Sequence, residues 1–218
     1  MAHLLTRREK QEQTRDRLLE AAARVFARRG YGQASVEEIA AEAGYTTGAV
    51  YSNFSGKEEL FLALADKHVE HRITDIRAVA EAARRGDEPG AEAAEQFREF
   101  LERDPDWPVL FYEFWSFGVR NAKLREEFGK RREALRDALA ETLERVAREL
   151  GFRLRFSAPV LATAINASLS GLAFERAANP DAIPDEVFAE FIAAVLACAV
   201  AAPEDEADPA RPTARTPR

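Results

Sequence analysis

The chain has a single cysteine, Cys198, among its 218 residues. One cysteine excludes an intramolecular disulfide and a cysteine-rich metal site. Apolar runs of about eighteen residues, which a transmembrane helix needs, are also missing, and the N-terminal residues lack the apolar core of a signal peptide. These absences favour a protein of the reducing cytoplasm without a membrane partner.

Excess positive charge is missing as well, since the formal net charge is −7. Residues 1–68 contain ten Lys and Arg and ten Asp and Glu, so the negative excess lies in the remainder of the chain. Within this neutral segment the first residues form a locally basic arm, with Arg7, Arg8, Lys10, Arg15 and Arg17. This distribution permits nucleic-acid binding near the N-terminus and disfavours it elsewhere.

Strand patterns are nearly absent, whereas apolar residues recur at helical spacing along most of the chain. Capping residues, glycines and prolines delimit the segments and predict an all-α protein. The predicted helices are 14–29, 36–43, 47–54, 57–85, 91–103, 107–119, 123–150, one that opens at 157–159 and ends before Asn179, and 185–201. We expect a flexible basic arm (1–13), a DNA-binding domain (14–56), an effector-binding and dimerisation domain (57–202) and a disordered proline-rich tail (203–218).

Two short predicted helices, 36–43 and 47–54, follow a longer one and are joined by a turn at Gly44. This order is typical of a helix-turn-helix, whose second helix enters the DNA major groove. An ordinary helical hairpin is the alternative. Small and hydroxyl-bearing residues at the start of the second helix suit a groove about 12 Å wide. The base-facing candidates are Thr47, Gly48, Ala49 and Ser52, and the phosphate candidates are Thr46, Tyr51, Asn53 and Lys57.

The stretch 34–60 closely resembles the DNA-binding domain of TetR-family transcriptional regulators, and the resemblance extends over 14–62. In register with the family are Gly44, Gly48, Tyr51, Phe54, Lys57 and Leu60. The resemblance implies a bacterial homodimer, usually a repressor, whose C-terminal helices bind a small effector that lowers DNA affinity. We expect no cofactor. Two positions depart from the family pattern, Tyr45 and Asn53, and they affect the expected operator sequence.

Because the second helix lacks Arg, Lys and Gln, we expect thymine-methyl and hydroxyl contacts to a palindromic operator. Further phosphate or minor-groove contacts are expected outside that helix, from Arg7, Arg8, Arg15, Ser35 and Tyr45.

The last two predicted helices carry apolar stripes that we expect to form a four-helix dimer interface. The predicted interface residues are Leu161, Ile165, Leu169, Leu172, Phe188, Phe191, Ile192, Val195, Leu196 and Ala199. Ala164, Ala167 and Gly171 would allow close approach. The alternative is that these faces close the core of one chain.

Aromatic residues gather in 97–117, which holds eight of the twenty in the chain. Large flat rings pack poorly without something between them, so this segment predicts a pocket for a hydrophobic or aromatic effector of drug-like or lipid-like size. Core packing is the alternative. The candidate ligand-binding residues are Phe97, Phe100, Trp107, Phe111, Tyr112, Phe114, Trp115, Asn166 and Ser170. Glu113 is expected to be solvated.

Two competing interpretations concern chemistry. His68 and His71, followed by Asp75, have a spacing compatible with a metal site, but a solvated helix face is the favoured explanation, and we expect no metal. Signature motifs of hydrolases and nucleotide-binding enzymes are missing. A helical enzyme and a DNA-binding protein without a ligand are the alternatives to a ligand-responsive regulator.

Overall fold

The computed structural model describes residues 6–87 and 89–199, without the side chains of residues 89, 90, 94, 185, 189 and 196. All elements within this part are helices, which confirms the predicted fold class. They are α1 (Arg7–Gln33), α2 (Val36–Ala43), α3 (Thr47–Tyr51), α4 (Lys57–Arg85), α5 (Pro89–Arg103), α6 (Trp107–Gly118), α7 (Ala122–Leu150), α8 (Ala158–Ala178), a 3-10 turn (Pro180–Ala182) and α9 (Asp185–Ala199). The predicted tail 203–218 lies outside the described residues.

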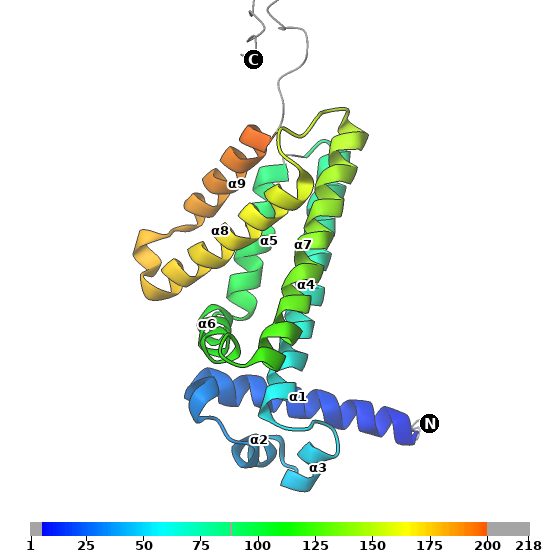
Figure 1. Cartoon of the computed structure of the whole chain (residues 1–218), viewed down its shortest axis with the longest axis vertical. Helices are drawn as coiled ribbons and strands as arrows, with labels where there is room; N and C mark the ends of the chain where they lie inside the picture. The colour runs from blue at the N-terminus through cyan, green and yellow to red at the C-terminus, as the bar shows by residue number, and fades with distance from the viewer. Residues whose placement is uncertain (1–5, 88, 200–218) are drawn as a thin grey trace, which may run out of the picture.

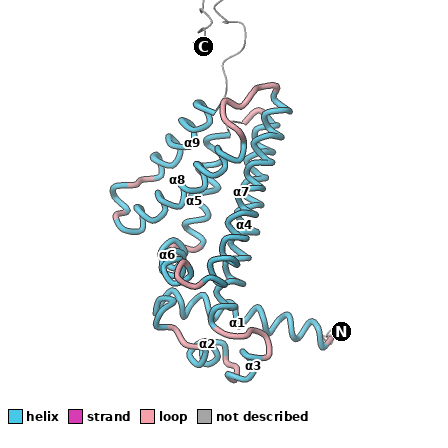
Figure 2. The backbone as a smooth tube through the Cα atoms, in the orientation of Figure 1, coloured by secondary structure: helices cyan, strands magenta, loops and turns pink. Residues whose placement is uncertain are grey.

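Two parts are stacked along the long axis of the molecule (Figure 1). Helices α1–α3, the N-terminal unit, form one end, and α4–α9, the C-terminal bundle, form the rest. The long helices α4 and α7 pack against each other, while α5 packs against both α4 and α9. Helix α6 lies at the junction and contacts α1, α7 and α8. Short loops connect the helices (Figure 2).

Helix α1 begins earlier than the sequence pattern predicted. The Thr6 hydroxyl accepts a hydrogen bond from the Glu9 amide, and the Glu9 carboxylate accepts one from the Thr6 amide. This capping box satisfies two otherwise unpaired backbone donors and starts the helix at Arg7. The prediction that residues 1–13 form a flexible arm is therefore wrong for residues 7–13, because this cap lies before the apolar periodicity on which the prediction relied.

The end of α1 is bent at Gly30, whose φ of 74° and ψ of 161° are not helical. A positive φ is easily adopted only by glycine. The chain then forms one more turn, Tyr31–Gln33, before α2. Gly30 therefore breaks the regular helix where the sequence predicted its end, and it points the following turn in a new direction.

The predicted capping of α2 is observed. Ser35 Oγ accepts from the Glu38 amide at 3.1 Å, and the Glu38 carboxylate accepts from the Ser35 amide at 3.2 Å. Gly44 ends the helix in the left-handed conformation, with φ 72°. Helix α3 is shorter than predicted and ends at Tyr51.

One apolar core extends through both parts of the molecule. Leu18 and Phe26 of α1, Phe61 of α4 and Phe114 of α6 belong to the same buried cluster. The N-terminal unit is therefore packed directly on the bundle. None of the described helices is long and apolar enough to cross a lipid bilayer.

Candidate nucleic-acid interface and effector cavities

Helix α3 presents small and hydroxyl-bearing residues at the surface of the N-terminal unit. Thr46 caps the helix, since its Oγ1 accepts a hydrogen bond from the Ala49 amide at 3.2 Å. Thr46 and Gly48 are exposed, Thr47 and Ala49 are half-buried, and Tyr51 is 56% exposed. The N-terminal half of α3 is therefore accessible, as a helix that enters a DNA groove needs to be.

Two of the predicted DNA contacts also hydrogen-bond to α3 itself. Ser52 Oγ donates to the Gly48 carbonyl oxygen at 2.8 Å, and Asn53 Nδ2 donates to the Ala49 carbonyl oxygen at 2.8 Å. The hydroxyl hydrogen of Ser52 is thereby used, and so is one of the two amide hydrogens of Asn53. The Gly48 carbonyl oxygen also accepts from the Ser52 amide at 3.0 Å, so it receives two hydrogen bonds from the same residue.

Lys57 differs from its predicted role as a phosphate contact. Its ammonium group donates to the carbonyl oxygens of Tyr31 at 2.7 Å, Gly32 at 3.2 Å and Ala34 at 3.0 Å. These bonds use all three ammonium donors. Lys57 therefore joins the start of α4 to the end of α1, where the unpaired carbonyl groups of a helix attract a cation.

Arg15 is likewise held inside the N-terminal unit. Its guanidinium donates to the Asn53 carbonyl oxygen at 2.8 Å and lies 4.1 Å from the centre of the Phe54 ring. This hydrogen bond uses one of the five guanidinium N–H donors and links α1 to the end of α3, so the predicted minor-groove or phosphate contact stays a prediction. This link fixes the direction in which α3 points.

The remaining predicted DNA contacts have different surroundings. Arg7 and Arg8 are exposed on the first turn of α1, and Arg8 pairs with Glu12 at 2.9 Å. Ser35 caps α2. Hydrogen bonding to Thr14, and further to Arg17, lowers the pKa of Tyr45. Arg7 and Arg8 are helical rather than part of a flexible arm.

Glu113 of α6 links the bundle to the N-terminal unit. One carboxylate oxygen accepts from the Tyr31 amide and the other from the Gly32 amide, each at 2.8 Å. A Cβ atom at Gly30 would lie only 2.8 Å from the same carboxylate. The prediction that Glu113 is solvated is therefore wrong. A signal was present, because Glu113 is the only charged residue in α6.

Stacked rings surround this link. The Phe114 ring lies 3.9 Å from that of Phe61, nearly parallel at 12°, and 4.9 Å from that of Tyr31 at 89°. Phe114 is fully buried at the junction, whereas Trp115 is 39% exposed. Neither residue lines the small cavity or the larger cavity of the bundle described next, in contrast to the prediction. Their places follow from the direction of α6, whose Phe114 side faces α1 and α4.

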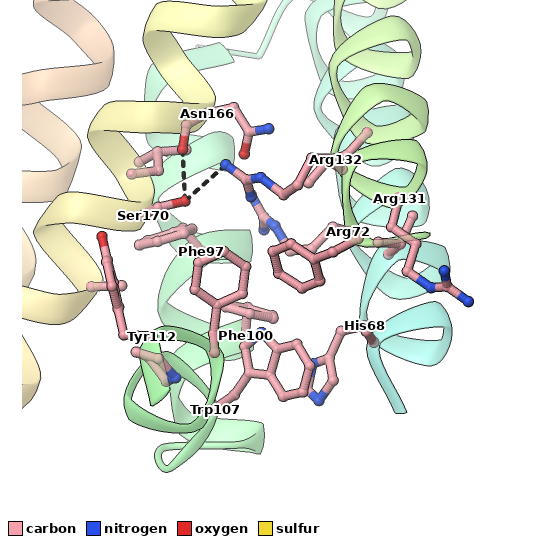
Figure 3. A pocket seen from close by; sticks show the side chains of 18 residues that line it. His68, Arg72, Phe97, Phe100, Trp107, Tyr112, Arg131, Arg132, Asn166 and Ser170 are labelled. Atoms are coloured by element: carbon pink, nitrogen blue, oxygen red, sulfur yellow. Dashed lines mark hydrogen bonds between the residues drawn. The ribbon is translucent and has the colours of Figure 1, made fainter. Parts of the chain in front are cut away.

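A small cavity of about 90 Å³ is lined by Trp107, Pro108, Phe111 and Tyr112 of α6 (Figure 3). The seven other predicted ligand-binding residues all line it: Phe97, Phe100, Trp107, Phe111, Tyr112, Asn166 and Ser170. Sequence reasoning missed His68 and three arginines in its wall, Arg72, Arg131 and Arg132. Charged residues on long helices are ordinarily solvated, so the sequence carried no signal for these arginines.

A second cavity of about 400 Å³ adjoins the first, and sequence reasoning missed it. Arg72, Leu135, Asn166 and Leu169 line both cavities. The remaining wall is mainly aliphatic and comes from α4, α7, α8 and α9. A volume of this size is typical of a site for a small molecule.

The predicted dimer stripe mostly closes the core of a single chain. Leu161, Leu169, Phe188, Ile192 and Ala199 are buried in one copy, and Ile165, Leu172 and Phe191 pack against the same core. The Phe188 ring lies 5.0 Å from that of Phe97 on α5, and Ile192 lines the larger cavity. Val195 is half-buried, and the Leu196 side chain lies outside the described residues. The assignment of the stripe to the dimer interface is therefore wrong for its buried members, because α5 and the bundle already cover them.

His68 and Asp75, two members of the metal-site alternative, have other partners. His68 Nε2 lies 2.9 Å from a carboxylate oxygen of Asp104, and its ring stacks on Trp107 at 3.6 Å. Asp75 pairs with Arg72 at 3.2 Å. No group of three potential metal-ligating side chains is found among the described residues.

Two family models match the chain. The model described as "Bacterial regulatory proteins, tetR family" matches residues 18–64, which include α2 and α3. The model described as "BetI-type transcriptional repressor, C-terminal" matches residues 91–201, about half of the chain.

Similar proteins agree with these matches. The repressor AcnR of Corynebacterium diphtheriae is 32% identical over 77% of this chain and 83% of its own length. The activator FasR of Mycolicibacterium smegmatis is 34% identical, but the match spans only 47% of each protein.

Solved structures share the fold. FadR of Bacillus subtilis in complex with stearoyl-CoA has a TM-score of 0.66 at 19% identity and covers 84% of this chain and 95% of its own. A SmeT–triclosan complex has a TM-score of 0.67 at 23% identity, with 87% and 92% covered. From the family models and the AcnR match, this chain belongs to the TetR family of bacterial transcriptional regulators.

Proposed function

We propose that this chain is a ligand-responsive repressor, which binds a palindromic operator as a homodimer and is released by a small hydrophobic or aromatic effector. The family assignment makes it a transcription regulator rather than an enzyme. The observation that carries the ligand response is the pair of hydrogen bonds that the Glu113 carboxylate accepts from backbone amides at the end of α1.

Helix α6 has two functional sides. Trp107, Phe111 and Tyr112 face the small cavity, while Glu113 holds the turn that follows Gly30. An effector that moves the cavity side of α6 would move Glu113 and with it the end of α1. Arg15 transmits this movement to α3, because it ties α1 to the Asn53 carbonyl group. The effector thereby favours a conformation in which the two α3 helices of the dimer no longer fit one operator.

The comparisons support this proposal. AcnR, which matches most of the chain, carries the name of a repressor. FadR was solved with stearoyl-CoA and SmeT with triclosan, both on the same fold. A helical bundle of this kind therefore accommodates hydrophobic small molecules in other proteins. The regulator would act on DNA in the bacterial cytoplasm.

The surface of α3 supports a particular set of DNA contacts. Thr47, Gly48 and Ala49 would approach base edges, and the Thr46 and Tyr51 hydroxyl groups would approach phosphates. Arg7 and Arg8, at the start of α1, add positive charge at the edge of the same unit. Lys57 and Arg15 act indirectly, because Lys57 joins the start of α4 to the end of α1 and Arg15 joins α1 to the end of α3.

The dimer is proposed to form through the other side of α8. Val160 is 57% exposed and Phe174 is 40% exposed, and the small residues Ala164, Ala167 and Gly171 lie between them at helical spacing. A large exposed apolar residue at each end of a flat strip of small residues suits close helix packing. Val195 of α9 is half-buried. It is among the residues that the sequence predicts for the dimer interface, and we include it in the proposed interface.

A footprint on the DNA upstream of the gene tests operator binding. We expect a symmetric protected segment, bound about a thousandfold more tightly than random DNA. Glu113→Ala then tests the coupling, with Glu113→Gln as the matched control that retains an acceptor. The alanine variant should bind an effector found by screening, yet respond to it less on DNA. Unselective DNA binding would refute the repressor, and full release of the alanine variant would refute this route of coupling.

A further inference from the structure

We propose that the effector is a carboxylic acid with one unbranched aliphatic chain, whose carboxylate binds Arg132 and whose chain fills the larger cavity. This inference rests on the proposed ligand response and names the chemical class of the ligand. It follows from three features of the two cavities: an uncompensated positive charge, a polar cradle and an elongated aliphatic wall.

The charge comes from unequal pairing of the arginines that line the cavities. Arg72 is neutralised by Asp75 at 3.2 Å, and Arg131 donates to Asp66 at 3.0 Å. Arg132 has no carboxylate partner in the described part of the chain. Its contacts are the Ser170 hydroxyl at 3.3 Å and the face of the Phe111 ring, 5.3 Å from the guanidinium carbon.

Arg132 is half-buried, and a guanidinium that is partly withdrawn from water without a counterion loses hydration that no anion replaces. Burial lowers the pKa of Arg132, and nearby Arg136 lowers it further. Arginine nevertheless stays protonated in proteins, so the cost is relieved only when an anion arrives. The small cavity therefore favours an acidic ligand over a neutral one.

A polar cradle surrounds this charge (Figure 3). Asn166 is only 8% exposed, and its Nδ2 atom is buried without a hydrogen-bond partner. Ser170 lies one helical turn further along α8, and its hydroxyl group contacts Arg132. A buried unpaired amide is also costly. A carboxylate could accept from Arg132 with one oxygen and from Asn166 with the other, which would satisfy both groups.

The volume of the smaller cavity limits the size of the ligand's polar head group. The cavity that contains Arg132 has about 90 Å³ of space, which suits a carboxylate and not a bulky headgroup. Asn166 lines both cavities. A ligand bound to Asn166 can therefore continue into the larger space without leaving the protein.

The larger cavity has the shape and surface for an alkyl chain. On α4 it is lined from Arg72 to Ala83, a span of about 16 Å at 1.5 Å per residue. The wall between these residues includes Ile76 and Val79, and α7 contributes Leu139 and Leu143 opposite. Aliphatic side chains along such a length suit a linear chain, since apolar burial is proportional to contact area.

The test of the head group compares dodecanoate with dodecan-1-ol on the purified full-length protein, by titration calorimetry and thermal stability without DNA. We expect dodecanoate to bind about 10- to 100-fold more tightly. Arg132→Met should remove this preference and leave the alcohol unaffected. Arg136→Met is the matched control. It removes the same charge one helical turn from Arg132, and Arg136 itself lines neither cavity.

The chain site is tested with Ala83→Phe, which places a ring in the larger cavity where Ala83 is buried. Dodecanoate should bind at least about tenfold more weakly to this variant, whereas octanoate should keep its affinity. Val146→Phe, from the opposite wall, gives the same measurement if Ala83→Phe does not fold.

Equal affinity for the acid and the alcohol would overturn the proposal, as would failure of dodecanoate to bind or an unchanged preference in Arg132→Met. If Arg132→Met does not fold, Arg132→Lys replaces it and should retain a weaker preference. These measurements do not involve DNA. Loss of operator recognition would therefore refute the proposed repressor while leaving the ligand class supported. Failure of the ligand measurements would refute the ligand class while leaving operator recognition supported.

Discussion

The Lys57 ammonium group lies 4.6 Å from the centre of the Tyr31 ring and donates a 2.7 Å hydrogen bond to the Tyr31 carbonyl oxygen. Tyr31 is buried, and this burial raises the pKa of its hydroxyl group. One residue of α4 therefore holds both the backbone and the ring of a residue at the end of α1. The start of α4 is thereby tied directly to the N-terminal unit.

Lys57→Met should destabilise the protein by about 2 kcal/mol, because charge-assisted hydrogen bonds to three carbonyl groups are lost. The salt dependence of operator binding should keep its slope, since Lys57 does not contact phosphate in this arrangement. Urea unfolding and affinity measured at several salt concentrations check both expectations. Lys67→Met is the control, because Lys67 forms only an exposed pair with Asp16 and should cost less than about 1 kcal/mol. If the slope of log affinity against log salt concentration fell by about one in Lys57→Met, the result would support a phosphate contact by Lys57 instead.

Phe114→Ala should cost about 3–5 kcal/mol, the usual loss for a buried aromatic side chain. Trp115→Ala should cost much less, because its ring is partly exposed. Since Trp115 does not line either cavity, the affinity for effector should stay unchanged in that variant. Chemical unfolding and ligand titration measure these effects. A large loss of effector affinity in Trp115→Ala would place the binding site on the other side of α6.

Acid should weaken the start of α4. Glu59 accepts a 2.7 Å hydrogen bond from the Ser55 amide, and this bond lowers the pKa of the carboxyl group below its ordinary value of 4.5. A lowered pKa means that folding favours the ionised form, so the stabilisation is present above about pH 4.5 and is lost as the pH falls below it. Glu59→Gln should therefore melt lower than the native protein at pH 7, and the two melting temperatures should converge in acid. A difference that is independent of pH would contradict this role.

Ala167→Glu should separate the dimer. The residue is exposed on α8 in one copy, so the charge does not disturb the fold, but two such charges would meet across the proposed interface. Sedimentation at micromolar concentration should show a monomer with native helical content. Ala134→Glu, exposed on α7, should remain dimeric. A dimeric Ala167→Glu would mean that another face is used.

Local patterns allowed the N-terminal unit to be predicted in detail. Ser35 and Glu38 are three residues apart, and Gly44 follows at the end of the same helix, so the signals for α2 lie within ten residues. The Thr6–Glu9 box at the start of α1 has the same form. It was overlooked because the apolar periodicity begins only later, near Leu18.

Long-range partners were not predictable from such patterns. Phe188 and Ile192 form an apolar stripe that looks the same whether it packs on α5 or on a second subunit. Lys57 and Glu113 are charged residues whose partners are backbone groups about 25 and 80 residues away. Backbone groups leave no trace in the sequence, so the partners of Lys57 and Glu113 could not be identified, although the isolated charge of Glu113 within α6 indicated that it needed one. The larger cavity was missed for a related reason, because aliphatic residues around an empty space resemble those of a filled core.

The short turn after Gly30 is held from two sides, with its carbonyl groups on Lys57 and its amides on Glu113. The two sets of hydrogen bonds come from different helices, Lys57 on α4 and Glu113 on α6, and can be broken separately. When Glu113 withdraws, the amide hydrogens of Tyr31 and Gly32 lose their acceptor and become open to exchange with solvent deuterium. Deuterium uptake at these two positions would therefore report the state of the regulator directly, without DNA and without an attached fluorophore.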